Sequence, residues 1–508
     1  MNRRALTPLL LAAGALACTQ EKPNVVLFVV DDMGPMDTSV PFLTDSNGVP
    51  VQYPLNHRYH TPNMERLSEQ GIRFSQFYAQ SVSSPSRCSL LTGQDAARHG
   101  TTNWIRSEFN NRDEYGPYDW NWQGLRREDY LLPRLMQDAG YRTIHVGKAH
   151  LGPIGSEAEW PDSLGFDINI AGSSFGEPGS YLGENGYGLL RGTRSRAVPG
   201  LEKYHGTDTF LTEALTLEAL EATGQAIDED RPFFLYLSHY AVHNPFEVDK
   251  RFAGNYQADS LENREALGYA TLVEGMDKSL GDLLDFLERK GVADKTLIIF
   301  LGDNGGDAPI GPARGWASSA PLRGKKGAEF EGGVRVPCIV AWARPSRNKM
   351  QRKYPVARDA VSQKVATIMD IYPTLAHFTG TQVPGNHPVD GQDLSLLLAG
   401  KPDPQREDVF LCHFPHEHRG SYYTTWRNGP WKLIYYYHPE NPEHPQCVLY
   451  NLEKDPFETT DVLDENRETA QRLLQEMISR LTDENAAYPV DSEGREVEIL
   501  LSLHHVLE

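Results

Sequence analysis

Apolar runs that end in polar residues recur along the chain. Segments 24–32 (NVVLFVVDD) and 296–304 (TLIIFLGDN) place carboxylates directly after a continuous apolar run. Segments 142–150 (RTIHVGKAH) and 231–243 (RPFFLYLSHYAVH) repeat the arrangement with Lys or His at the end. Continuous apolar runs are typical of strands that are buried on both faces of a parallel sheet. The pattern therefore predicts a buried parallel sheet with polar groups at its strand ends.

Segments with apolar residues at helical spacing alternate with these runs. The longest of them carries apolar residues three or four positions apart and stops before Gly291. The predicted helices cover residues 62–71, 128–139, 208–227 and 261–290. Alternating strands and helices build an α/β domain. We expect a large, mostly parallel sheet flanked by helices.

Two stretches between these elements are rich in Gly, Asn, Tyr and Trp. They span residues 100–125 and 170–205. Long loops of this kind often shape a substrate pocket. We expect both to lie over one end of the sheet.

The pattern changes after about residue 400. Residues 422–437 (YYTTWRNGPWKLIYYY) predict a β-hairpin about Asn428-Gly429-Pro430, and CVLYNL at 447–452 predicts a further strand. A helix is expected near 466–482. We therefore predict a main α/β domain at 24–400 and a smaller C-terminal α+β subdomain with an antiparallel sheet at 401–508.

The first residues have the pattern of an export signal. Arg3 and Arg4 precede an apolar stretch, Leu6–Ala17, that is too short to span a membrane. Residues 1–17 are expected to be a signal peptide, and 18–23 a linker. Two hypotheses stay open: ordinary cleavage after Ala17, or lipidation of Cys18 as in a bacterial lipoprotein. Both predict an exported protein, periplasmic or attached to the outer membrane of a Gram-negative bacterium. Only a lipid anchor would bring it to the membrane.

Composition narrows the class of ligand. The chain has 508 residues and a formal net charge of −20, which argues against a nucleic-acid partner. An anionic substrate remains compatible if a local cationic pocket binds it. Of the five Cys, Cys412 and Cys447 lie in the C-terminal region. They are expected either to form a disulfide or to remain as buried thiols.

Ligands of open α/β sheets bind beyond the carboxyl ends of the strands. Asp31, Asp32, Asp303 and Asn304 would converge there. Three carboxylates at one place repel each other unless a cation neutralises them. The set offers only hard oxygen atoms, which suits Ca²⁺ or Mg²⁺ better than zinc.

Cationic and imidazole side chains occupy comparable positions. They are Arg87, Lys148, His150, His243 and Lys326. Beside a metal, such a group indicates an anion clamp that would hold a tetrahedral oxyanion ester.

These motifs together resemble a known family. Residues 83–87 (SSPSR), followed by LLTG, match the Cys/Ser-x-Pro-x-Arg signature of formylglycine-dependent sulfatases in the alkaline-phosphatase superfamily. Further matching motifs, in the family's order, are VVDDMG at 29–34, GKAHLG at 147–152, GDNGG at 302–306 and LRGKKGAEFEGGVRVP at 322–337. The resemblance covers about residues 24–400, and WKLIYY and LYNLEKDPFE extend it into the C-terminal part.

The resemblance implies a role for each residue. Ser83 is the residue oxidised to formylglycine, whose hydrate would attack the sulfate ester. One Ca²⁺ ion would be bound by Asp31, Asp32, Ser83, Asp303 and Asn304. Arg87 would stabilise the aldehyde hydrate, and His150 would be the base that releases the sulfate. Lys148, His243 and Lys326 would bind sulfate, with His243 or Lys326 protonating the leaving alcohol.

The chain departs from the family pattern in a few places. RGKKG replaces the commoner Arg-Gly-Gly-Lys-Gly, and spacing selects Lys326 over Lys325. Val242 stands where Pro is usual before His243. Cys88 follows the signature and is expected to pack in a helix. A Ser at position 83 implies maturation by the anaerobic, radical-type sulfatase-maturating enzyme.

The substrate expected from this resemblance is a sulfated carbohydrate, such as galactose or N-acetylgalactosamine sulfate from a host glycan or an algal polysaccharide. Five aromatic residues in the long loops either stack on sugar rings or pack the loops: Trp104, Trp120, Trp122, Tyr181 and Tyr187. Two alternatives to a sulfatase remain. One is a metal-dependent phosphomonoesterase or phosphonate hydrolase on the same fold, and the other is an inactive, exported glycan-binding lipoprotein.

Overall fold

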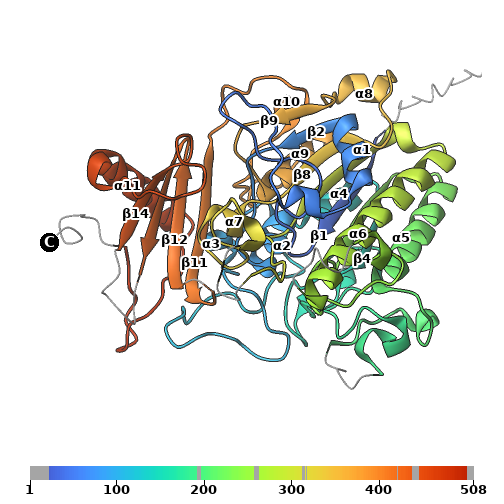
Figure 1. Ribbon diagram of the computed structural model, residues 1–508, viewed down its shortest axis with the longest axis horizontal. Helices are drawn as coiled ribbons and strands as arrows, with labels where there is room; N and C mark the ends of the chain where they lie inside the picture. The colour runs from blue at the N-terminus through green and yellow to red at the C-terminus, as the bar shows by residue number, and fades with distance from the viewer. Residues whose placement is uncertain are drawn as a thin grey trace, which may run out of the picture.

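The computed structural model shows a large α/β part and a smaller C-terminal β-rich part beside it (Figure 1). The structure describes residues 22–190, 196–256, 263–311, 315, 317–419, 421–437 and 446–499. The predicted signal peptide at 1–17 and Cys18 lie outside these residues. Among the helices of the described ranges, none combines the length and the apolar character needed to cross a membrane.

The central element is an eight-stranded sheet in the order β5-β4-β6-β1-β7-β8-β2-β9. Only β8 runs antiparallel to its neighbours. This arrangement confirms the predicted mostly parallel sheet. Its strands are β1 (Asn24–Val30), β2 (Gly71–Phe74), β4 (Arg142–Gly147), β5 (Ile168–Ile170), β6 (Phe233–His239), β7 (Thr296–Gly302), β8 (Cys338–Trp342) and β9 (Ala360–Ser362).

Helices cover both faces of this sheet. Successive residues of β1 point to opposite faces, so Phe28 packs in one apolar core and Leu27 in the other. The first core is closed by α1 (Pro62–Gln70), α5 (Leu211–Asp228) and α6 (Arg264–Arg289), and the second by α2 (Ser83–Thr92), α4 (Leu132–Asp138) and α9 (Ile371–Thr379). Short elements complete this part: β3 (Phe77–Tyr78), β10 (Ala366–Thr367), α3 (Ala96–His99), α7 (Glu331–Val334), α8 (Lys349–Lys353) and α10 (Ser395–Leu398).

The C-terminal part is a four-stranded antiparallel sheet with a helix on one face. Its elements are β11 (Val409–Glu417), β12 (Ser421–Asn428), β13 (Trp431–Tyr436), β14 (Cys447–Asn451) and α11 (Arg467–Asp483). Asn428 pairs with Trp431, which confirms the predicted hairpin about Gly429-Pro430. Cys412 and Cys447 are buried free thiols, so the disulfide alternative is wrong. They lie in different apolar clusters of this sheet.

A buried cluster of charges joins the two parts. Lys432 Nζ on β13 lies 3.1 Å from Glu331 Oε1 on α7 and 2.7 Å from Glu458 Oε1. The Tyr78 hydroxyl donates to Glu331 Oε2 at 2.6 Å. Burial opposes ionisation of Glu331, but Lys432 and Arg335 outweigh it and lower its pKa to about 2. Burial raises the pKa of Glu458 to about 7. Arg335 Nη2 also lies 3.1 Å from Glu331 Oε2, so Lys432 is the cation that Glu331 and Glu458 share.

Replacing Lys432 with Met should destabilise the fold by about 3–5 kcal/mol, because two buried carboxylates would lose their shared cation. Urea denaturation measures this loss. Lys364→Met is the matched control, since the Lys364 side chain is about half exposed in its pair with Asp408 and should contribute under about 1 kcal/mol. Equal effects of the two substitutions would contradict the role of the cluster.

Buried neutral histidines make the fold sensitive to acid. His239 on β6 packs against Phe28, and its Nε2 hydrogen-bonds to Ser279 Oγ at 2.9 Å. Burial lowers the pKa of His239 to about 3, whereas the unfolded chain takes up this proton near 6.5. The unfolded state thus binds the proton first. Stability contributed by the neutral ring is present above pH 6.5 and is lost as pH falls toward 3.

His239→Gln should remove this acid sensitivity. Below pH 6, the free energy of unfolding of the wild type should fall relative to the variant by about 1.4 kcal/mol per pH unit. Urea denaturation of both proteins at several pH values measures the difference. Parallel pH curves for the two proteins would contradict the buried, neutral state of this ring.

Candidate active site

The adjacent parallel strands β1 and β7 bring three carboxylates together. Val30 pairs with Gly302, so both chains leave the sheet at the same edge. Asp31, Asp32 and Asp303 follow, and a ligand oxygen of each lies within 4.8 Å of the others. The backbone N–H of Asp32 donates to Asp303 Oδ1 at 3.1 Å. All three side chains are buried.

Ser83 lies against this carboxylate group at the first residue of α2. Val82 before it is extended, and the helix starts at Ser83 with Pro85 in its first turn, a position that tolerates Pro. Ser83 Oγ is 3.2 Å from Asp31 Oδ1 and 3.1 Å from Asn304 Oδ1, and it accepts from Lys148 Nζ at 3.1 Å.

Arg87 is held one helical turn after Ser83, on the same side of α2. Its Nε donates to Asp303 Oδ2 at 2.8 Å, and its Nη1 donates to Ser238 Oγ at 2.6 Å. Nη1 also contacts the backbone oxygen of Lys148 at 3.1 Å. The side chain has no solvent exposure. Contacts from three strand ends thus fix its direction.

Two lysines neutralise the other carboxylates. Lys148, which follows β4, places Nζ 2.7 Å from Asp31 Oδ2. Lys326 Nζ lies 2.8 Å from each oxygen of Asp32. His243 Nε2 is 3.5 Å from Asp32 Oδ2. Lys148 is fully buried, whereas Lys326 and His243 also line the cavity above.

The protonation of His150 follows from its contacts. Its Nε2 lies 2.7 Å from the Ile105 carbonyl oxygen, which only accepts, so Nε2 carries the proton. Its Nδ1 is buried and has no hydrogen-bond partner among the described residues. Burial and the nearby Lys148 charge lower the pKa of His150 well below its usual value. The ring is therefore neutral, with a lone pair free to accept a proton.

The donor atoms at the strand ends fit a hard divalent cation. Asp31, Asp32, Asp303, Asn304 and Ser83 supply only oxygen ligands, as calcium prefers. Burial raises the pKa of Asp31 well above its usual value, although Lys148 lowers it in part. A bound cation would keep this carboxylate ionised. The group therefore meets the chemical requirements of a calcium site.

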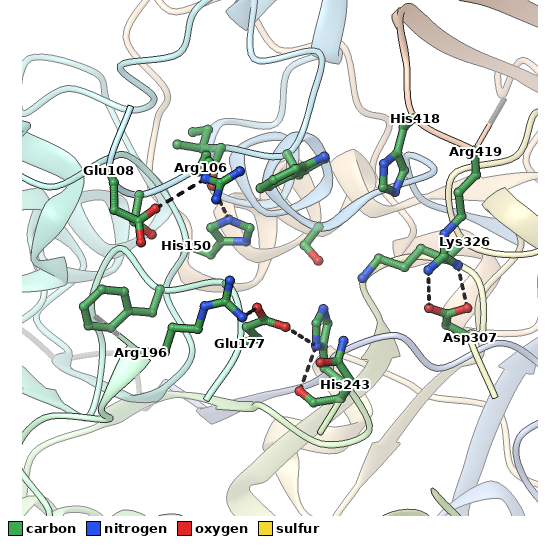
Figure 2. A pocket seen from close by; sticks show the side chains of 17 residues that line it. Arg106, Glu108, His150, Glu177, Arg196, His243, Asp307, Lys326, His418 and Arg419 are labelled. Atoms are coloured by element: carbon green, nitrogen blue, oxygen red, sulfur yellow. Dashed lines mark hydrogen bonds and ion pairs between the residues drawn. The ribbon is translucent and has the colours of Figure 1, made fainter. Parts of the chain in front are cut away.

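A cavity of about 270 Å³ opens above this group. Ser83, His150, His243 and Lys326 line its floor, and Figure 2 shows the charged side chains of its walls around it. The long loops predicted to shape a pocket supply two walls, through residues 104–108 and through residues 175–177 with Arg196. The structure thus brings every predicted site residue to this cavity or directly beneath it.

Several wall residues were not predicted from the sequence. They are Arg106, Glu108, Glu177, Arg196, Asp307, His418 and Arg419. Asp307 lies three residues after Asn304, and that proximity could have identified it. Arg419 follows β11 in the C-terminal part, and no local pattern links it to the strand ends. The wall therefore depends on tertiary contacts that the sequence does not reveal.

Most of the loop aromatics support the loops. Trp104 lines the cavity, but Tyr181 and Tyr187 are completely buried, and Trp120 is 4% exposed. Trp122 Nε1 donates to the Arg106 carbonyl oxygen at 3.1 Å. Packing is thus the correct interpretation for Trp120, Tyr181 and Tyr187. Cys88 is buried in the α2 core, as expected.

Comparison with known proteins gives consistent matches. The sulfatase family profile matches residues 23–381, and the profile "N-sulphoglucosamine sulphohydrolase, C-terminal" matches residues 326–487. A sulfatase of Formosa agariphila is 29% identical over 520 residues, covering 91% of this chain and 88% of that protein. The N-acetylgalactosamine-6-sulfatase of Mus musculus is 32% identical over 411 residues, covering 77% of this chain and 68% of that protein.

Solved structures share the fold. The structure of Ps i-CgsB in complex with k-i-k-neocarrahexaose superposes with a TM-score of 0.70 at 24% identity. The alignment covers 93% of this chain and 96% of that one. The likeness extends over both the α/β part and the C-terminal sheet.

Asp32→Asn should weaken calcium binding at least tenfold, because one anionic ligand becomes neutral. Asp32 is chosen because its partner Lys326 borders the cavity and can be solvated there. Calorimetric titration with Ca²⁺ measures the affinity. Asp277→Asn, a buried carboxylate bound to the backbone of Asn63, is the control and should bind calcium as the wild type does. Unchanged affinity in Asp32→Asn would contradict the assignment.

Proposed function

Because the chain belongs to the sulfatase family and is a sulfuric ester hydrolase, we propose that it removes sulfate from a carbohydrate by means of Ser83 oxidised to formylglycine. A relative named as an N-acetylgalactosamine-6-sulfatase and the polar side chains of the cavity walls support this substrate class. We favour a galactose or N-acetylgalactosamine sulfate from a host glycan or an algal polysaccharide.

The position of Ser83 is the observation that carries the proposal. Its hydroxyl lies on the cavity floor, between the carboxylate oxygen of Asp31, the amide oxygen of Asn304 and the ammonium group of Lys148. These contacts include the Asp31 carboxylate but no imidazole or neutral amine, so an unmodified serine hydroxyl would be a weak nucleophile. The hydrate of formylglycine carries two hydroxyls on one carbon. One attacks sulfur and displaces the alcohol, and loss of the proton from the other expels sulfate and regenerates the aldehyde.

The surrounding cations suit the charge of a sulfate ester. Lys326 holds its ammonium group at the floor, and Lys148 holds its own directly beneath it, 3.1 Å from Ser83 Oγ. Both would bind sulfate oxygens. His243 lies beside them and, with Lys326, is positioned to protonate the leaving alcohol. Arg87, locked by Asp303 and Ser238, would orient the hydroxyls on residue 83.

His150 is suited to accept the proton that completes turnover. Its Nδ1 lone pair is free, and the hydrogen bond from Nε2 to Ile105 fixes the ring. Asp31, Asp32, Asp303, Asn304 and residue 83 would hold one Ca²⁺ ion, which would polarise the sulfate and make a bound hydroxyl more acidic.

The proposal extends to maturation and location. A serine at position 83 calls for the radical-type maturase, which acts without oxygen. The apolar N-terminal stretch supports export to the periplasm or the outer membrane, where external glycans arrive.

Mass spectrometry of the peptide containing residue 83 tests the central step. The protein is produced in anaerobic cells with and without a radical-type maturase. The co-expressed protein should carry an aldehyde, a loss of about 2 Da from serine, and should hydrolyse 4-nitrophenyl sulfate. Protein made without maturase should be at least 100-fold less active.

Two variants and a phosphate ester serve as controls for this experiment. Ser83→Ala should be inactive even with maturase, whereas Cys88→Ala, which alters the neighbouring thiol, should keep activity if it folds. 4-Nitrophenyl phosphate should be a poor substrate. Full sulfatase activity in protein whose Ser83 is unmodified, or a preference for the phosphate ester, would refute the proposal.

A further inference from the structure

An arginine–aspartate pair forms the wall of the cavity beside Lys326. Arg419 Nη1 and Nη2 lie 2.5 and 2.7 Å from the two oxygens of Asp307. Lys325 Nζ is 3.4 Å from Asp307 Oδ1. Figure 2 shows the pair next to the Lys326 side chain, on the opposite side of the cavity from Arg196 and Glu177. Only 13% of the Asp307 side chain is exposed.

The backbone ties this pair to the sulfate-binding floor. Asp307 follows Asn304 by three residues, and the backbone N–H of Lys326 donates to the Gly306 carbonyl oxygen at 3.1 Å. A group bound by Asp307 and Arg419 would therefore lie next to the sulfate held by Lys326. On a sugar, that group is a substituent near the sulfated carbon.

The pair offers a donor and an acceptor side by side. A guanidinium has five N–H groups, and Asp307 occupies two of them; an ionised carboxylate accepts about four hydrogen bonds. Both residues line the cavity. A hydroxyl both donates and accepts, so it matches this pair. Because both partners are charged, the resulting hydrogen bonds are stronger than neutral ones.

The charge of the wall disfavours a second anion at this position. Among the residues that line the cavity, Asp307 neutralises Arg419, and a further sulfate or carboxylate would lie against the Asp307 carboxylate. Lys325, which also contacts Asp307 Oδ1, does not line the cavity. The other arginines of the wall are also paired with carboxylates, Arg106 with Glu108 and Arg196 with Glu177. The walls therefore favour neutral polar groups, in contrast to the cationic floor.

We propose that Asp307 and Arg419 determine specificity by binding a free hydroxyl on the sugar ring beside the cleaved sulfate. They select a hydroxylated ring over an apolar one, and over a ring that carries a second sulfate at that position. The inference rests on the proposed function. The cavity of about 270 Å³ lies below the roughly 300–1,000 Å³ of sites for drug-sized ligands. It is therefore sized for about one sugar ring.

The test compares a sugar substrate with an aryl substrate on the matured enzyme. The probes are N-acetylgalactosamine 6-sulfate, or galactose 6-sulfate if the enzyme prefers it, and 4-nitrophenyl sulfate, which lacks ring hydroxyls. In Asp307→Asn and Arg419→Lys, the ratio of sugar to aryl kcat/KM should fall about 10- to 100-fold. Arg419→Lys keeps the charge, so its effect isolates the planar donor arrangement.

A second arm tests the exclusion of a neighbouring anion. The wild type should prefer the monosulfated sugar to the corresponding 4,6-disulfated sugar at least tenfold. Asp307→Asn removes the repelling carboxylate and should narrow this preference several-fold. The exclusion of a neighbouring anion is wrong if the wild type does not prefer the monosulfated sugar, or if Asp307→Asn leaves that preference unchanged.

Asp285→Asn is the matched control, because Asp285 accepts from Arg66 at 2.7 Å in an exposed pair outside the cavity. It should leave both ratios unchanged. Thermal melting and the aryl activity report whether each variant folds. If the wild type hydrolyses the aryl sulfate but no sugar sulfate, or if both wall variants keep the wild-type ratio, the specificity inference fails and the sulfatase chemistry stands. Activity on neither substrate refutes the proposed function itself.

Discussion

Three buried carboxylates at adjacent strand ends are the constraint on which the rest of the site depends. Asp31, Asp32 and Asp303 lie within a few ångströms of one another and out of contact with solvent. Their mutual repulsion in a low-dielectric interior is large. Arg87, Lys148 and Lys326 each contact one of them directly. These cations would bind the substrate sulfate or the modified side chain. The same cations offset the electrostatic repulsion among the three carboxylates.

This sharing links metal binding to substrate binding. A divalent cation among the carboxylates would supply the charge that the lysines now provide. Lys326 at the floor and Lys148 directly beneath it would then have ammonium charge available for sulfate oxygens without moving. The same residues therefore serve stability and recognition. Tyr181 adds to the rigidity of the floor, since its hydroxyl donates to the backbone oxygen of His243 at 2.8 Å.

The floor was predictable from the sequence because strand geometry determines it. A parallel sheet brings its carboxyl ends to one edge, so Asp31 and Asp303 had to be close once both runs were identified as strands. Burial of the loop aromatics was not predictable in the same way. Tyr187 lies in a loop rich in Gly, Asn and Tyr, as a sugar-stacking residue would, yet it is fully buried in the core. Only packing distinguishes these cases.

The walls come from segments whose positions depend on long-range contacts. His416 on β11 contacts Thr102 at 2.8 Å and Asp113 at 3.4 Å, and so ties the loop of residues 100–125 to the C-terminal sheet. Arg419, three residues further on, reaches Asp307 across the cavity edge. The C-terminal part therefore completes the substrate cavity instead of merely covering the α/β part. Substitutions in such walls can change which sugar is accepted while the buried floor, and hence the chemistry, stays the same.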